Sequence, residues 1–405
     1  MRKKIKNSFV KVKNNQLDLF RDFFESEKSS GYILIALTII SLVIANGSGG
    51  SDYINMWRSY LDFSFSEIHL RYSIEHWIND GLMVIFFLLV GLEIEREIYV
   101  GELSSIKKAS LPIIAALGGM VVPAAIHFTF NSGTPTQSGF GIPMATDIAF
   151  ALGILSLLGN RIPLTLKIFL TALAIIDDLG AIIVIAIFYT NNLSIAYLLS
   201  SLGVFTILLV LNKLGVNKLT PYLLLGVIMW YLMLKSGVHA TISGVLLAFA
   251  IPFRKNTSQN ISYVLQERLH KPVAFFILPL FALANTAILL PDNVVASLTT
   301  DNSLGVILGL FIGKPLGILL FSFLSVVVGL SQLPNGTNWK LIGGAASLAG
   351  IGFTMSIFIT NLAFSTENVI VESKMSIIVA STISAVMGIL ILTLITKIKV
   401  KINLD

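Results

Sequence analysis

The chain has 405 residues, of which 55% are hydrophobic and 12% are charged, and its formal net charge is +6. Soluble domains carry about 25% charged residues, so this composition excludes an ordinary soluble protein and indicates a membrane protein with many spans. The positive charge does not indicate a nucleic-acid partner, because Lys and Arg stand in short groups between apolar runs and form no single basic face.

The sequence predicts one all-α transmembrane domain, residues 31–398, between a basic N-terminal segment, residues 1–30, and a short tail, residues 399–405. Within the basic segment, residues 16–28 fit an amphipathic interfacial helix and a disordered tail equally well. A span needs about 20 mostly apolar residues. This criterion predicts about twelve spans, near residues 31–46, 78–98, 109–130, 144–158, 164–190, 193–212, 219–235, 239–252, 273–290, 304–329, 341–361 and 373–396.

The distribution of basic residues predicts that both termini face the cytoplasm. If the chain alternates from an internal N-terminus, the inner segments hold 23 of the 28 Lys and Arg residues. The outer loops hold only Arg58, Arg71, Lys235 and Lys374. Such a bias follows the positive-inside rule.

Residues 63–77, between the first two spans, alternate apolar and polar side chains and are rich in aromatic residues. This pattern predicts a short β-hairpin in an outer, periplasmic loop. An exposed strand edge there could pair with a second copy of the chain.

The second span ends in an acidic cluster, GLEIERE, with Glu93, Glu95 and Glu97. Clusters of this kind are usually solvated span ends. The alternative is a funnel that attracts cations toward the membrane interior.

Two apolar segments are interrupted by glycines and small residues, GFGIPMATDIAFALG (139–153) and GGAASLAGIGFTMSIF (343–358). Broken helices in corresponding positions of two halves are typical of transporters that bind substrate near the bilayer midplane. Thr146 and Asp147 stand at the first break, where they could serve as ordinary helix N-caps or compensate the charged ends of a broken helix.

Asp177 and Asp178 are the only charged residues between Lys167 and Lys213. A charged side chain at bilayer depth costs about 2.5–3.5 kcal/mol on insertion scales. Adjacent residues on a helix point about 100° apart, so one cation cannot easily satisfy both carboxylates. The pair therefore predicts a site for a hard cation or a proton, since carboxylate, hydroxyl and carbonyl oxygens suit small hard cations.

Lys314 lies in the middle of the tenth predicted span, between Gly313 and Pro315. An ammonium at that depth needs an anionic partner, and the intramembrane candidates are Asp147, Asp177 and Asp178. The pair could break and re-form during transport, or it could be a purely structural ion pair.

The chain has no cysteine, and its five histidines, His69, His76, His127, His239 and His270, have no metal-ligand spacing. Each fits a polar surface or packing role. His239 and His270 could also titrate near neutral pH.

Six motifs, in this order over nearly the whole chain after residue 30, resemble the NhaA-type sodium/proton antiporters: FFLLVGLEIERE, PMATDIAFALG, ALAIIDDLGAI, VHATISGV, ILPLFALANT and IGKPLGI. The resemblance implies twelve spans in inverted repeats, with the fourth and eleventh broken and crossed at the midplane. It also implies a bacterial inner-membrane protein that forms a homodimer through the hairpin at 63–77. The N-terminal 30 residues and the extra acid Glu95 depart from the family pattern.

The resemblance also implies residue roles. Asp178 and Asp177 would bind the proton and the Na⁺ or Li⁺ ion, with Thr146 contributing. Asp147 and Lys314 would neutralise the broken helix ends, and Lys314 would pair with Asp177 when the site is empty. The pH-sensing region would include Glu93 and Glu97, with Glu267, His270 and His239 as further candidates.

The expected function is therefore an electrogenic, pH-regulated Na⁺(Li⁺)/H⁺ antiporter, which is not an enzyme and needs no cofactor beyond the transported ions. A sodium-coupled symporter of organic anions would need a larger polar or basic pocket. An intramembrane aspartyl protease would need its two aspartates on different helices, and a channel would not couple sodium to a proton gradient.

Overall fold

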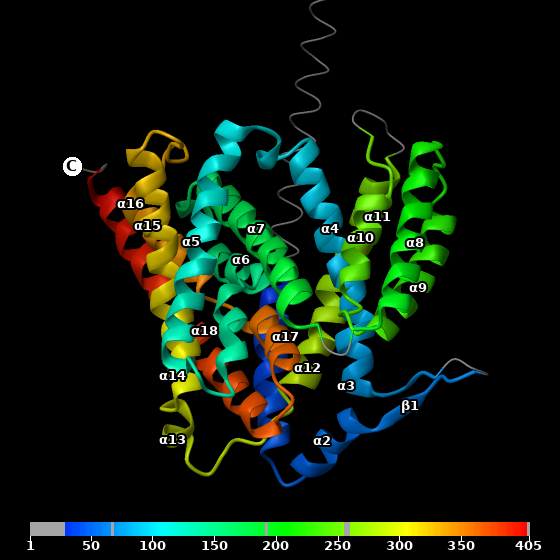
Figure 1. The fold of residues 1–405 in the computed structure, drawn as a ribbon. Coiled ribbons are helices and arrows are strands. Elements are labelled where there is room, and N and C mark those ends of the chain that lie inside the picture. Colours follow the sequence, from blue (N-terminus) through cyan, green and yellow to red (C-terminus); the bar gives the residue numbers. More distant parts are fainter. Residues whose placement is uncertain (1–28, 66–68, 191–192, 255–259, 403–405) are drawn as a thin grey trace, which may run out of the picture.

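The computed structural model describes residues 29–65, 69–190, 193–254 and 260–402 (Figure 1). The predicted helix or tail at 16–28 lies outside the described residues, as does the end of the C-terminal tail.

The described elements are a helix Ser29–Ala45, α2 (Gly50–Arg58), β1 (Tyr60–Asp62), β2 (Arg71–Ser73), α3 (Ile74–His76), η1 (Trp77–Leu82), α4 (Met83–Tyr99), η2 (Glu102–Ser104), α5 (Ile106–Asn131), η3 (Gln137–Met144), α6 (Ile148–Ser156), η4 (Gly159–Arg161), α7 (Leu164–Phe188), α8 (Ile195–Lys213), α9 (Leu219–Ser236), α10 (Ile242–Ala250), α11 (Ile261–Pro272), η5 (Val273–Ile277), α12 (Leu278–Asn285), α13 (Val294–Leu298), α14 (Asp301–Leu308), η6 (Gly309–Gly313), α15 (Lys314–Val327), α16 (Trp339–Ala349), α17 (Phe353–Ala363) and α18 (Glu367–Ile402).

The prediction of a polytopic helical membrane protein is confirmed. Within the described residues, eight helices are long and apolar enough to cross a membrane, and the number rises to ten if each of two bent helix pairs counts as one span. One pair is Ser29–Ala45 with α2, bent by 114°, and the other is α16 with α17, bent by 46°.

The β-hairpin is present, but its predicted position was partly wrong. Strands β1 and β2 pair antiparallel, with Tyr60 opposite Ser73 and Asp62 opposite Arg71. The hairpin therefore begins before residue 63 and ends at residue 73. The hydroxyl of Ser73 accepts the N–H of His76 at 3.1 Å and caps a helix there, so the alternating pattern of the sequence continues into helical rather than extended backbone.

Glycines let helices α5 and α15 approach at backbone distance. A Cβ atom added to Gly317 would lie 2.1 Å from the carbonyl oxygen of Gly118, and one added to Gly118 would lie 2.3 Å from that of Gly317. Small residues at such crossings allow close helix packing in membranes. Because Lys314 lies one turn before Gly317, this contact brings its side chain into the interior, where it is 0% exposed.

The two interrupted segments meet at their breaks. In the first, extended residues 145–147 separate η3 from α6, and in the second, residues 350–352 separate α16 from α17. The N–H of Asp147 donates to the carbonyl of Ile351 at 2.7 Å, and the hydroxyl of Ser356 donates to the carbonyl of Ile142 at 2.7 Å. Each interrupted segment thus supplies a hydrogen-bond donor to a backbone carbonyl of the other. Irregular backbone inside a membrane requires such partners.

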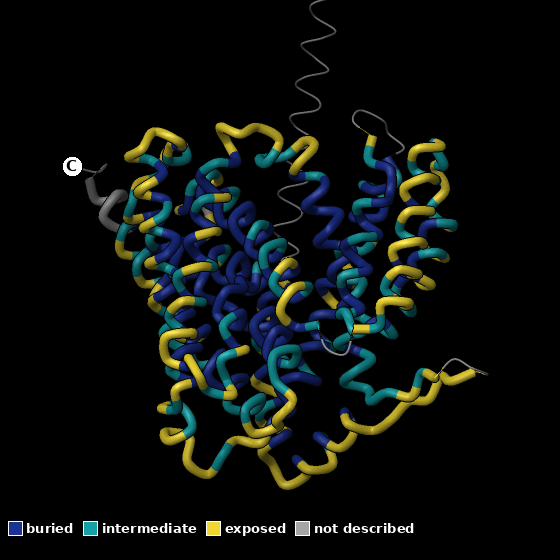
Figure 2. The backbone as a smooth tube through the Cα atoms, viewed as in Figure 1, coloured by how far each residue is buried: buried dark blue, intermediate teal, exposed yellow. Residues whose placement is uncertain are grey.

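Burial follows the pattern of a membrane protein. Figure 2 shows that buried residues fill the centre around α6 and α7, whereas α8 at one edge and strand β1 of the hairpin are largely exposed. The exposed side chains of α15 are apolar and those of α8 are mostly so, for example Val327 at 66% and Leu199 at 62%. Such surfaces are stable against lipid and not against water.

Candidate ion-binding site

Helix α7 buries both of the adjacent aspartates at its middle. Asp177 is 0% exposed and Asp178 is 2% exposed. Flanking residues of α7 such as Leu173, Ala174 and Ala181 are also buried, so the helix is enclosed on several sides there. Two carboxylates in such surroundings need compensating groups.

Asp177 receives its compensation on one oxygen. Its Oδ2 atom lies 3.0 Å from the Lys314 ammonium nitrogen and accepts the hydroxyl of Thr146 at 2.8 Å. The other oxygen, Oδ1, is buried and has no hydrogen-bond partner among the described residues. Of the three partners that the sequence allowed for Lys314, the fold thus selects Asp177.

Asp178 also presents a buried Oδ1 atom that has no hydrogen-bond partner within the described part of the chain. Buried polar atoms are nearly always paired. Two consecutive residues therefore each carry a carboxylate oxygen whose lone pairs no described group satisfies.

The C-terminal ends of η3 and α16 contact the two groups that bind Asp177. The Thr146 hydroxyl oxygen also lies 3.0 Å from the carbonyl oxygen of Ala349, the last residue of α16, so its one proton is shared between that carbonyl and Asp177. The ammonium of Lys314 donates to the carbonyl of Met144, the last residue of η3. Both groups thus lie at the partially negative ends of half-helices, where positive charge is favourable.

Lys314 begins α15 directly after the π-helical turn η6. Pro315 has no N–H group, so a regular hydrogen bond is missing at this point of the helix. Single π-helical turns inside α-helices are frequent at functional sites.

Asp147 faces the opposite, N-terminal ends of the two breaks. Its Oδ1 atom accepts the N–H of Phe150 in α6 at 3.0 Å, and its Oδ2 atom accepts the N–H of Thr354 in α17 at 3.0 Å together with the hydroxyl of Thr354. One carboxylate therefore compensates two positive helix ends. The sequence pointed to the segment 343–358 without singling out Thr354, which is the second residue of α17.

A small cavity joins Asp178 to two of the expected pH-sensing residues. It has a volume of about 30 Å³ and is lined by Asp178, Glu93 and His270 among apolar side chains. That volume admits roughly one or two water molecules. Glu93 is 7% exposed, so the acidic end of α4 is not simply a solvated span end.

The remaining expected residues lie apart from this cavity. Glu97 pairs with Arg96 at 2.9 Å and accepts the N–H of Glu102 at 2.9 Å. Glu267 is exposed and accepts the hydroxyl of Tyr263 at 3.2 Å. His239 Nε2 lies 2.8 Å from the carbonyl of Tyr189.

Comparison with known proteins agrees with this geometry. A family model described as Na⁺/H⁺ antiporter 1 matches residues 21–392. An Na⁺/H⁺ antiporter NhaA of Flavobacterium psychrophilum is 60% identical over 370 residues, which are 91% of this chain and 94% of the relative. One of Cytophaga hutchinsonii is 57% identical over 94% of this chain and 96% of the relative, and one of Dechloromonas aromatica is 58% identical over 92% and 94%. These matches over nearly the whole chain, together with a helical membrane fold in which two breaks meet beside a buried Asp–Asp–Lys group, show that this chain belongs to the NhaA family of Na⁺/H⁺ antiporters.

Proposed function

We propose that the protein exchanges cytoplasmic Na⁺ or Li⁺ for external protons through one shared site at Asp177 and Asp178. The observation that carries this proposal is the pair of buried, unpartnered Oδ1 atoms on these residues. Family membership gives no support to an organic-anion symporter or an aspartyl protease.

The proposed mechanism is competition between cation and protons. In this structure the Lys314 ammonium pairs with Asp177. In that state, the carboxylate oxygens that the ammonium does not contact can accept protons. An arriving cation displaces the ammonium and takes oxygens of Asp178, Asp177 and Thr146, all of which suit a hard ion. Alternating access then exposes the site to the two sides in turn.

The decisive measurement uses everted membrane vesicles with a preformed pH gradient. Adding Na⁺ or Li⁺ is expected to collapse the gradient, and K⁺ is not. The response is expected to shrink as the pH falls, because protonated carboxylates cannot bind the cation. A potential-sensitive dye is expected to report charge movement during exchange. If neither Na⁺ nor Li⁺ disturbs the gradient between pH 6.5 and about 9, a range around the histidine and buried-carboxylate values, the proposal is wrong.

We propose further that the cavity beside Asp178 belongs to the pH-regulated access route. Glu93 and His270 line it, while Glu97, Glu267 and His239 would act from farther away. Charge changes at these positions would alter how readily a cation reaches Asp178.

The proposed topology has twelve spans in inverted repeats, with both termini on the cytoplasmic side of the inner membrane. The hydrogen-bonded contact between the two breaks and the inward bias of 23 basic residues support it. A green fluorescent protein fused to the C-terminus is expected to fluoresce, and an alkaline phosphatase fused there to stay inactive. The reverse result would contradict the orientation.

The hairpin is the proposed dimer contact. Strand β1 is exposed at all three residues, and the hairpin projects from the helical body (Figure 1). A two-stranded sheet has free edges that can pair with a second copy. Deleting the hairpin is expected to convert a dimer into a monomer in native mass spectrometry, and an unchanged mass would rule this contact out.

A further inference from the structure

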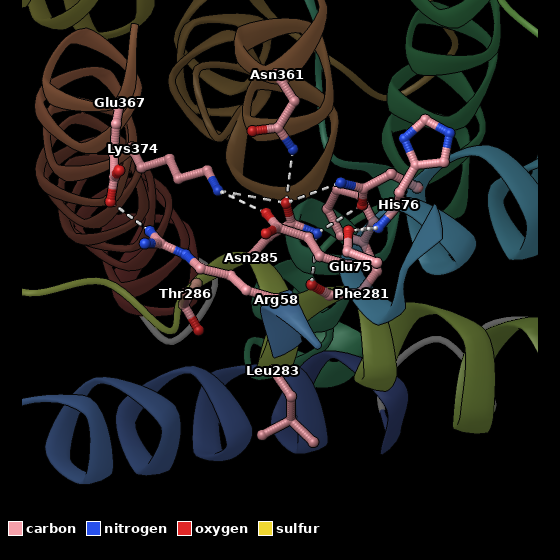
Figure 3. Close-up of polar contacts among 12 residues, drawn as sticks. Arg58, Glu75, His76, Phe281, Leu283, Asn285, Thr286, Asn361, Glu367 and Lys374 are labelled. Atoms are coloured by element: carbon pink, nitrogen blue, oxygen red, sulfur yellow. Dashed lines mark hydrogen bonds and ion pairs between the residues drawn. The ribbon is translucent and has the colours of Figure 1, made fainter. Parts of the chain in front are cut away.

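Lys374 was expected in an outer loop, but α18 buries it. The side chain is 4% exposed. Its ammonium nitrogen lies 3.5 Å from Oε1 of Glu75, in α3, and 3.4 Å from Oδ1 of Asn285, at the end of α12 (Figure 3). No role in the site at Asp177 and Asp178 accounts for this second buried ammonium.

The Asn285 carbonyl oxygen is the focus of this group. It accepts the amide of Asn361 at 2.6 Å, and the Asn79 amide nitrogen lies 3.5 Å away. A carbonyl oxygen has two lone pairs, so three donors exceed what it can accept at short distance. The ammonium contacts are correspondingly long, and Lys374 is held loosely.

The surroundings of the ammonium favour positive charge independently of Lys374. Asn285 is the last residue of α12, whose C-terminal end carries partial negative charge. The amide nitrogen of Asn285 donates back to the carbonyl of Phe281 at 3.0 Å, which fixes its oxygen toward Lys374. The Glu75 carboxylate adds negative charge 3.5 Å from the ammonium.

Glu75 and Lys374 line a cavity of about 450 Å³ together with Asn361, and Asn285 lies behind this lining, in contact with the Lys374 ammonium and the Asn361 amide. The same lining contains Arg58 and Glu367, which form an ion pair between α2 and α18. A second cavity of about 510 Å³ also touches this ion pair. The two spaces together are far larger than the one beside Asp178 and have room for a hydrated ion.

Helix α17 connects this cavity to the ion-binding site. Thr354, which binds Asp147, and Asn361, which binds Asn285, are seven residues apart on α17. At 1.5 Å per residue the separation is about 10 Å along the helix axis. The cavity at Asn361 therefore lies about 10 Å along α17 from Thr354, which contacts Asp147 beside the ion-binding site. It lies on the hairpin side of the molecule.

We propose that Glu75 and Asn285 form a second site for a monovalent hard cation, on the hairpin side, which the ammonium of Lys374 occupies in the absence of an ion. Carboxylate and amide oxygens suit Na⁺ or Li⁺. A cation in the cavity displaces the loosely held ammonium, and the ammonium returns when the cation departs. Lys374 thereby keeps external sodium from occupying the site. This site is separate from the one at Asp177 and Asp178.

The test measures binding of ²²Na⁺ to the purified full-length protein in an Asp178→Asn background. Binding at the proposed site is the part of the ²²Na⁺ binding that Glu75→Gln removes. Adding Lys374→Met is expected to increase this part about tenfold, which is less than the full change in affinity that removing a unit charge at this separation could cause. Adding Glu75→Gln to that variant is expected to abolish the gain. Lys374→Arg, which keeps the charge, and Lys235→Met, which removes a partly exposed lysine in the last turn of α9, are expected to give no gain.

The readout is the difference between variants with and without Lys374→Met, so residual binding in the Asp178→Asn protein does not affect it. If Lys374→Met does not fold, as judged by size-exclusion chromatography, Lys374→Gln takes its place. A second measurement keeps Asp178 intact and adds Na⁺ to the hairpin side of proteoliposomes. Lys374→Met is expected to lower about tenfold the Na⁺ concentration on that side at which exchange is inhibited, because the ammonium charge no longer repels the cation. No gain in binding, or a gain that survives Glu75→Gln, would overturn the proposal.

Discussion

Replacing Asp178 by asparagine is expected to abolish Na⁺/H⁺ exchange while leaving the protein folded. The interaction of unit charges about 4 Å apart is worth about 4 kcal/mol at an effective dielectric constant of 20. Losing it corresponds to roughly a thousandfold loss of cation affinity. Stability is not expected to fall, because the amide replaces a buried carboxylate that has an unpartnered oxygen. Sodium-dependent collapse of a pH gradient in everted vesicles measures the first effect, and thermal unfolding in detergent measures the second.

Asp52→Asn is the matched control, because Asp52 is an exposed residue of α2 far along the chain from α7. That variant is expected to exchange normally. Full exchange by Asp178→Asn would remove Asp178 from the ion-binding site, whatever its effect on stability.

Replacing Lys314 by methionine is expected to cause the largest loss of stability among single changes at the site. The ammonium is completely buried and lies 3.0 Å from Asp177. Removing one partner of a buried ion pair costs about 3–5 kcal/mol, because the other charge remains without compensation. The carbonyl of Met144 at the end of η3 would lose its donor as well. We expect a clear fall in the thermal unfolding temperature of the detergent-solubilised protein.

The double variant Lys314→Met with Asp177→Asn separates the two contributions. If the cost is the uncompensated carboxylate, the double variant is expected to be more stable than Lys314→Met alone, although it should not transport. Lys340→Met, an exposed change in α16, serves as the control for losing a lysine. Equal stability of Lys314→Met and the unaltered protein would show that the pair carries little free energy of folding.

The hairpin shows one limit of prediction from sequence. The alternation of residues 63–77 correctly indicated strands in this loop, but side-chain period alone did not reveal where the strand backbone ends. The hydroxyl of Ser73 ends it by capping the next helix. Such a cap competes with strand pairing only when the following residues, here those of α3, are already held as a helix by the rest of the fold.

Lys374 shows a second limit. The sequence counted it with the outer basic residues, since it stands at the very start of a predicted span. Its burial depends on the end of α12, on Asn361 in α17 and on Glu75, which are distant in the chain. No local pattern could have predicted that these groups converge.

The sequence by itself determined the membrane class, the two interrupted segments and the residues Asp177, Asp178 and Lys314, because charge inside an apolar span is costly enough to stand out without any structure. The residues alone left Asp147, Asp177 and Asp178 open as partners of Lys314; the tertiary structure pairs Lys314 with Asp177, as the family resemblance implied, and shows that Asp147 serves two helix ends, one of them at Thr354. Those choices depend on backbone approaches of a few ångströms, such as the contact between Gly118 and Gly317 that brings Lys314 inward. The composition and the spacing of apolar residues show which buried charges and helix ends need a partner. The packing of the helices decides which partner each of them receives.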